Sequence, residues 1–191
     1  VMPDHPLFLL LAEIAAKHDV PIDFHMDAVT EDMDFPKRLS SLGKGNPTRL
    51  KANVAAFENL LSHNEKARFV WQHAGSDPVG GMTADLLRRL LEAHSNLYVG
   101  LRVAYPRAMP ENPRLVNAVL DEQGQLRSEW LKLFTDFSDR FVCGSDTFVN
   151  KGNKGDARSP FPGTWAFVRK LPPDLAKKVG GGNAARIYGL Q

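Results

Sequence analysis

Three side chains that could bind a metal ion or transfer a proton each follow a short apolar run of the sequence: His25, His73 and Asp146. The apolar runs before them span residues 22–24, 69–72 and 141–145. Neutral imidazole nitrogen and carboxylate oxygen suit Zn²⁺ or Mn²⁺ as ligands. If the runs are parallel strands, all three side chains lie at their carboxyl ends, where such folds build active sites. The pattern predicts one shared site.

Each of these residues also has a purely structural interpretation. His25 and His73 could be hydrogen-bonded core histidines, and Asp146 could cap the turn after residues 144–145. Three matching positions on three runs favour the shared site. Arg102 ends a further apolar run and could bind a substrate carboxylate through two nitrogens, although a structural ion pair is the alternative.

Other polar or reactive residues fit structural roles. His18, His63 and His94 fall at the ends of expected helices, where unpaired carbonyls favour positive charge. Cys143 lies within an apolar run and is expected in the core. The glycines at 180–182 read as a helix stop, with Asn183 capping the last helix.

Helical and strand patterns alternate along the chain. Helices are expected near residues 6–18, 48–63, 83–94 and 129–137, and strands near 20–24, 68–71, 96–103 and 140–143. The first helix would present Leu7, Leu10, Leu11, Ile14 and Ala15 on one side. Longer loops are expected at 104–128 and 150–163, and Gly80 and Gly81 would let the backbone approach a ligand closely. The alternation predicts an α/β fold with a parallel sheet, either doubly wound or a barrel.

The length fits a single domain spanning residues 1–191. A complete eight-stranded barrel takes about 250 residues. Because only four strands are expected and the chain starts in mid-pattern with a helix, we expect a (β/α) TIM-barrel type of fold limited to its second half, about four βα units. An open four-stranded α/β sheet is the alternative.

The composition limits which kinds of binding partner are expected. The formal net charge is +2, with basic and acidic residues interspersed, so nucleic acid is not expected as a partner. No apolar stretch is long enough for a membrane span, and a single cysteine fits a reducing, cytoplasmic location. A small-molecule substrate is the expected partner.

Four segments resemble, in order, the later strands and closing helix of the amidohydrolase-related family, in particular the branch that includes aminocarboxymuconate-semialdehyde decarboxylase-like enzymes. They span residues 23–27, 70–75, 141–146 and 182–188. The resemblance implies a distorted eight-stranded barrel with one or two divalent ions, Zn or Mn. It implies that His25 and Asp146 bind metal, and that His73 and Asp146 move the proton of an activated water.

The implied reaction is metal-dependent hydrolysis of a C–N, ester or lactone bond. A metal-dependent decarboxylase of the same family and a non-catalytic α/β binding or interaction module are the alternatives. The family carries His-x-His after its first strand, and this sequence contains no His-x-His. The chain is therefore expected to bind metal weakly and to be weakly active or inactive by itself. Two copies could associate as a homodimer, or the chain could pair with a missing N-terminal half.

Overall fold

The fold is taken from a computed structural model of the chain. It describes residues 1–37, 39, 45, 47–103, 116–146 and 161–190. Residues 104–115 of the first expected loop and 150–160 of the second lie outside these residues. None of the described helices is both long and apolar enough to cross a bilayer.

The core of the fold is a four-stranded parallel sheet. Its strands are β1 (Ile22–Phe24), β4 (Phe69–Ala74), β5 (Leu97–Arg102) and β6 (Phe141–Gly144), and they pair in the order β1-β4-β5-β6. The strands therefore lie side by side in the same order as in the sequence. This order lacks the reversal of a doubly wound sheet and is the order of neighbouring strands in a barrel. The predicted α/β fold with a parallel sheet is confirmed.

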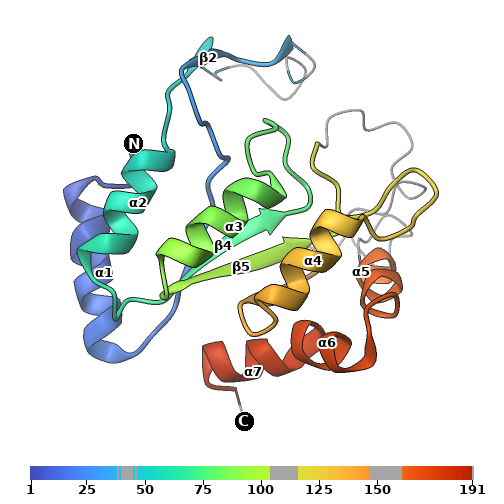
Figure 1. The fold of residues 1–191 in the computed structure, drawn as a ribbon. Helices are drawn as coiled ribbons and strands as arrows, with labels where there is room; N and C mark the ends of the chain where they lie inside the picture. Colours follow the sequence, from blue (N-terminus) through green and yellow to red (C-terminus); the bar gives the residue numbers. More distant parts are fainter. Residues whose placement is uncertain (38, 40–44, 46, 104–115, 147–160, 191) are drawn as a thin grey trace, which may run out of the picture.

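Helices follow the strands and cover one face of the sheet. They are α2 (Val54–His63), α3 (Ala84–Ala93) and α4 (Ser128–Asp136). In Figure 1, α3 and α4 lie in front of β4 and β5, and α2 lies beside α1. Aromatic side chains fill the space between the layers: Phe57 packs against Trp71 with ring centroids 5.0 Å apart, and Phe134 packs against Phe141 at 4.9 Å. Burying these large rings stabilises the fold.

The closing segment runs through three short helices and one wider turn. They are α5 (Phe161–Val168), α6 (Pro173–Lys177), a π-helical turn (Lys178–Gly182) and α7 (Asn183–Tyr188). Ile187 of α7 packs with Val70 and Val142 in a small cluster separate from the main core. Because side chains alternate along a strand, this cluster lies on the face opposite to Phe69 and Trp71.

The expected helix stop at 180–182 is confirmed, because Gly181 has non-helical backbone angles and a kink there separates two helices. The expected capping role of Asn183 is wrong. Asn183 is itself helical and does not cap α7 through its side chain. Its amide instead donates hydrogen bonds of 2.8 Å to the carbonyls of Ser138 and Phe141, which ties α7 to β6.

The helix α1 (Pro6–His18) also buries a different face from the one expected. Ala12 and Ala15 are buried, and Phe8 packs on Phe24 with ring centroids 5.6 Å apart. The leucines and isoleucine of the expected stripe are exposed: Leu7, Leu10, Leu11 and Ile14. The helix is apolar on nearly every side, so its periodicity alone does not select the packed face.

The second helix begins six residues later than expected. Residues 48–50 are not helical, because Arg49–Leu50 forms β3, which pairs antiparallel with β2 (Met33–Asp34). Figure 1 shows this hairpin projecting away from the sheet. Leu50 therefore belongs to the hairpin rather than to the apolar face of α2.

The expected role of Gly81 needs correction as well. A Cβ atom built on Gly81 would stand 2.2 Å from the carbonyl oxygen of Ala28. The missing side chain thus allows two segments of the chain to touch, the loop after β4 and the loop after β1, and it does not open a path for a ligand.

We expect Gly81→Ala to lower the free energy of unfolding by about 2 kcal/mol, because the added methyl group clashes with backbone that has little room to move. Urea-induced unfolding measures this loss. Gly144→Ala is the control, since a Cβ there meets nothing within 4 Å. Equal stability of the two variants would contradict the close packing at Gly81.

Candidate functional site

The carboxyl ends of the four strands carry the polar side chains singled out in the sequence. His25 follows β1 directly, His73 lies near the end of β4, Arg102 ends β5, and Asp146 follows β6 by two residues. Because the strands are parallel, these positions share one rim of the sheet.

The backbone at His73 is irregular, and this irregularity changes the direction of the His73 side chain. In a regular strand His73 would share the core face of Phe69 and Trp71. The register with β5 shifts between Trp71 and Ala74, and His73 has a positive φ of 75°. The backbone and hydroxyl of Ser76 donate to the His73 carbonyl at 3.1 and 3.2 Å and support this turn. Bulges of this kind are common beside active sites, where they redirect a side chain.

The structure brings the four rim residues together pair by pair. The rings of His25 and His73 have centroids 4.2 Å apart. His73 Nε2 lies 3.6 Å from Asp146 Oδ2, and Arg102 Nε lies 3.3 Å from the same oxygen. Asp146 itself has a positive φ of 48°, a conformation that Asp tolerates. The Asp146 carboxylate thus stands between an imidazole and a guanidinium.

The surroundings of His73 favour its neutral form. Removal from water lowers the pKa of His73 most, and nearby His25 and the Arg102 cation lower it further, while Asp146 acts in the opposite direction. A neutral imidazole is the form that can accept a proton from water. His73 is therefore a neutral imidazole that lies close to a carboxylate, although at 3.6 Å the two groups are not hydrogen-bonded.

The described residues do not form a complete metal site. Among them, no three His, Cys, Asp or Glu side chains are grouped so that they could hold a metal ion. The Asp146 oxygen nearest His73 already faces the cation of Arg102. Tight zinc binding normally takes three or four protein ligands, so His25 and Asp146 do not suffice.

Arg102 contacts Asp146, which is the structural ion pair that the sequence left open. The pair is about 30% exposed, so water still reaches it. The guanidinium thereby helps to fix the position of the carboxylate. Binding of a substrate carboxylate by Arg102 stays a prediction, and so do the catalytic roles of His73 and Asp146 and the metal-binding roles of His25 and Asp146.

Sequence reasoning did not single out Asp77. Asp77 is 3% exposed. Its Oδ1 accepts from the backbone of Val79 and Gly80 at 2.9 Å each. Its Oδ2 accepts from Met82 N at 2.6 Å and from Asn117 Nδ2 at 3.1 Å. One carboxylate thus organises the whole loop that follows His73, and an Asp-Pro pair before a Gly-Gly pair was the only sequence signal.

A second acid close to the rim, Asp27, has a different environment. Neighbouring atoms displace water from its carboxyl group and raise its pKa, and the charge of Asp77 raises it further, while His25 has a smaller opposite effect. The backbone around Asp27 is held by Trp71, whose indole donates to Met26 O at 2.7 Å, and by Asn53, whose amide donates to Asp27 O at 2.9 Å.

Three other histidines have contacts away from the rim, and Cys143 is a partly buried residue of β6. His63 pairs with Glu13 at 3.0 Å, and His94 lies 3.6 Å from Glu58. His5 accepts from the backbone of Leu7 at 3.2 Å and caps α1. Burial raises the pKa of the Cys143 thiol to about 12, so this side chain is a poor nucleophile.

The structure thus defines an α/β protein whose parallel sheet carries imidazole, carboxylate and guanidinium groups at its carboxyl rim. Comparison with family models narrows this class: the chain matches the amidohydrolase model over residues 3–190 and belongs to the amidohydrolase family. Searches of curated proteins and of solved structures gave no match.

Asp77→Asn tests the structural role of the buried carboxylate. The variant amide can accept on one side only, so either Met82 N or the Val79 and Gly80 pair faces an NH₂ group. We expect the free energy of unfolding to fall by about 2 kcal/mol, as measured with urea. The matched control is Asp121→Asn, because Asp121 accepts from Gln123 and Gln125 through a single oxygen. A loss as large for Asp121→Asn would argue against this explanation.

Arg102→Met tests the electrostatics at His73. Removing the cation takes away one cause of the lowered pKa and leaves Asp146 free to stabilise the imidazolium, so the pKa of His73 should rise. Titration of the His73 ring signals by NMR measures the change. Lys51→Met is the control, since the Lys51 ammonium binds Asp32. A His73 pKa that falls or stays constant in Arg102→Met would refute the described arrangement.

Proposed function

We propose that this chain contributes the proton-transfer part of a metal-dependent hydrolase site that acts on a C–N, ester or lactone bond of a small molecule. The observation that carries the proposal is the neutral His73 beside the Asp146 carboxylate at the sheet rim. Membership of the amidohydrolase family supports a hydrolase-like activity.

The chemistry that these residues can perform is general-base hydrolysis. With its Nε2–H directed toward Asp146, His73 accepts a water proton at Nδ1 while the water oxygen attacks the carbonyl carbon of the substrate. Asp146 stabilises the imidazolium that forms. The proton then passes from His73 to the leaving nitrogen or oxygen as the scissile bond breaks, which restores neutral His73.

Members of the family generally use a divalent ion such as Zn or Mn, and His25 and Asp146 are the candidate ligands in this chain. Because the described residues leave the set incomplete, we infer that the chain alone binds a divalent ion weakly and is weakly active or inactive. Further ligands would have to come from elsewhere.

We also infer that the sheet represents the second half of a barrel. The one-directional strand order supports this inference, because four neighbouring barrel strands would pair in this way. Association of two copies, or of this chain with a segment that supplies other strands, would cover the outer edges of β1 and β6, which pair with no further strand among the described residues. The molecular mass in solution tests such association.

A non-catalytic binding or interaction module is the second candidate. The observation in its favour is the Arg102–Asp146 ion pair, which neutralises the carboxylate that hydrolysis would use. The decarboxylase alternative would need Arg102 to leave Asp146 and bind a substrate carboxylate. Carbon dioxide release from a panel of aromatic and unsaturated acids would distinguish decarboxylation from hydrolysis.

An assay of ester and lactone hydrolysis with and without excess Zn²⁺ tests the proposal. We expect weak turnover, little change in thermal stability with zinc, and a loss of about 100-fold in any measurable rate in His73→Gln. Cys143→Ser is the control and should keep the wild-type rate, because the thiol is half-buried and remains protonated.

The outcomes separate two claims. Strong turnover that His73→Gln abolishes would support the His73 base and refute the incomplete site. Turnover that survives His73→Gln would refute the proposed role of His73 itself.

A further inference from the structure

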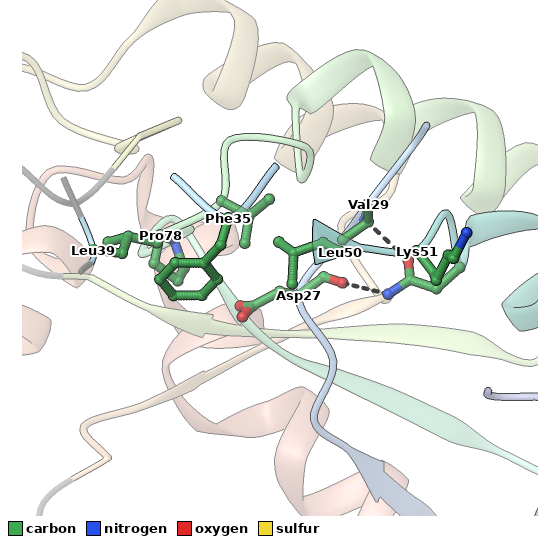
Figure 2. A pocket seen from close by; sticks show the side chains of 9 residues that line it. Asp27, Val29, Phe35, Leu39, Leu50, Lys51 and Pro78 are labelled. Atoms are coloured by element: carbon green, nitrogen blue, oxygen red, sulfur yellow. Dashed lines mark hydrogen bonds between the residues drawn. The ribbon is translucent and has the colours of Figure 1, made fainter. Parts of the chain in front are cut away.

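A cavity of about 550 Å³ lies between the β2–β3 hairpin and the loop that follows β4. Its size falls in the range of sites for small organic ligands, roughly 300–1,000 Å³. Figure 2 shows the side chains around it. The lining is mostly apolar and consists of Asp27, Val29, Phe35, Leu39, Leu50, Lys51, Asn53, Pro78 and Val79.

Two of the three polar lining residues are already engaged. Asn53 accepts from the backbone of Val29 and donates to the carbonyl of Asp27, at 2.9 Å in each case. The Lys51 ammonium binds Asp32 at 2.6 Å. In Figure 2 this ammonium points away from the carboxylate of Asp27. Neither side chain offers a free charged group to a ligand.

The third polar residue, Asp27, is different. Its carbonyl accepts from Asn53, but its carboxylate accepts no hydrogen bond from the described part of the chain. Asp27 and Phe35 both line the cavity, and both side chains are labelled in Figure 2. The negative charge of Asp77 is close enough to act on the Asp27 carboxylate. Both oxygens of Asp77 already accept hydrogen bonds from the protein.

The charges and shape select one class of ligand. An anion would face the repulsion of both Asp27 and Asp77. A neutral apolar molecule would fill the cavity but would remove water from the Asp27 carboxylate without pairing it, which is costly. An organic cation pairs with the carboxylate, and the aromatic ring of Phe35, which also lines the cavity, can add a cation–π contact.

We propose that this cavity binds a small organic cation, with an ammonium head against Asp27 and an apolar or aromatic body against Phe35 and Leu50. The inference concerns binding alone and does not depend on the proposed reaction, because His73 and Asp146 do not line the cavity.

Three ligands of nearly equal size test the charge selection: 2-phenylethylammonium, 2-phenylethanol and 3-phenylpropionate. Calorimetric titration of the wild-type chain should give an affinity about tenfold higher for the ammonium than for the alcohol, and the weakest binding for the carboxylate. Backbone amide signals of Val29 and Val79 should shift on addition of the ammonium in NMR spectra.

Asp27→Asn keeps the side-chain shape and removes the charge, so the ammonium and the alcohol should then bind equally. Asp34→Asn is the matched control, because Asp34 is an exposed residue of the same hairpin that does not line the cavity. It should leave the tenfold preference unchanged. His73→Gln should also bind the ammonium as the wild type does, which keeps this test separate from the hydrolysis assay.

Three results would overturn the inference: equal binding of ammonium and alcohol by the wild type, a preference that persists in Asp27→Asn, or shifts confined to residues outside the cavity. Thermal unfolding of each variant establishes that it is folded. If Asp27→Asn does not fold, the ligand series and the shift pattern of the wild type decide the question alone.

Discussion

The parallel pairing of β1, β4, β5 and β6 in sequence order is the constraint on which the rest of the structure depends. It places four strand ends at one rim although their residues are far apart in the sequence. It also leaves the strands buried between helices on one face and α7 on the other, so their apolar composition follows from the topology. A different strand order would separate His73 from Arg102 and Asp146.

At the rim of this sheet, the ion pair of Arg102 and Asp146 determines how much negative charge Asp146 offers to other groups. Asp146 is attracted by the guanidinium and lies near the imidazole of His73, so one carboxylate serves two partners. Arg102 fixes the carboxylate in place, but it also reduces the negative charge available to a metal ion or an imidazolium. The same contact therefore favours a well-ordered rim and disfavours strong metal binding by the residues described.

Much of this arrangement could be predicted from the sequence, since apolar runs of β-forming residues followed by His25, His73 and Asp146 indicate strands that end at a common edge. Periodicity did not predict which side of α1 is buried, because Leu7 to Ile14 is apolar nearly all round and tertiary packing of Phe8 on Phe24 decides. It also did not predict the β2–β3 hairpin, whose two-residue strands are too short to show a pattern.

The bulge at His73 and the hydrogen bonds of Asp77 lie beyond sequence patterns for another reason. Both depend on partners distant in the chain: the shifted register with β5 in one case and Asn117 in the other. A regular two-residue alternation would have placed His73 in the core, so the sequence-based expectation of a rim histidine required a backbone irregularity that no local signal encodes.

Asp27 and Asp77 show how the surroundings separate structural from functional acids near one rim. Asp77 is buried, yet four donors satisfy both of its oxygens, so its charge stabilises the loop and leaves nothing for a ligand. Asp27 faces a cavity with mostly apolar walls, and its carboxylate accepts no hydrogen bond from the described residues, so it can accept one from a ligand. The saturated acid also repels anions from the unsaturated one. The loop that Asp77 organises thus sets both the shape of the cavity and the sign of the charge that the cavity attracts.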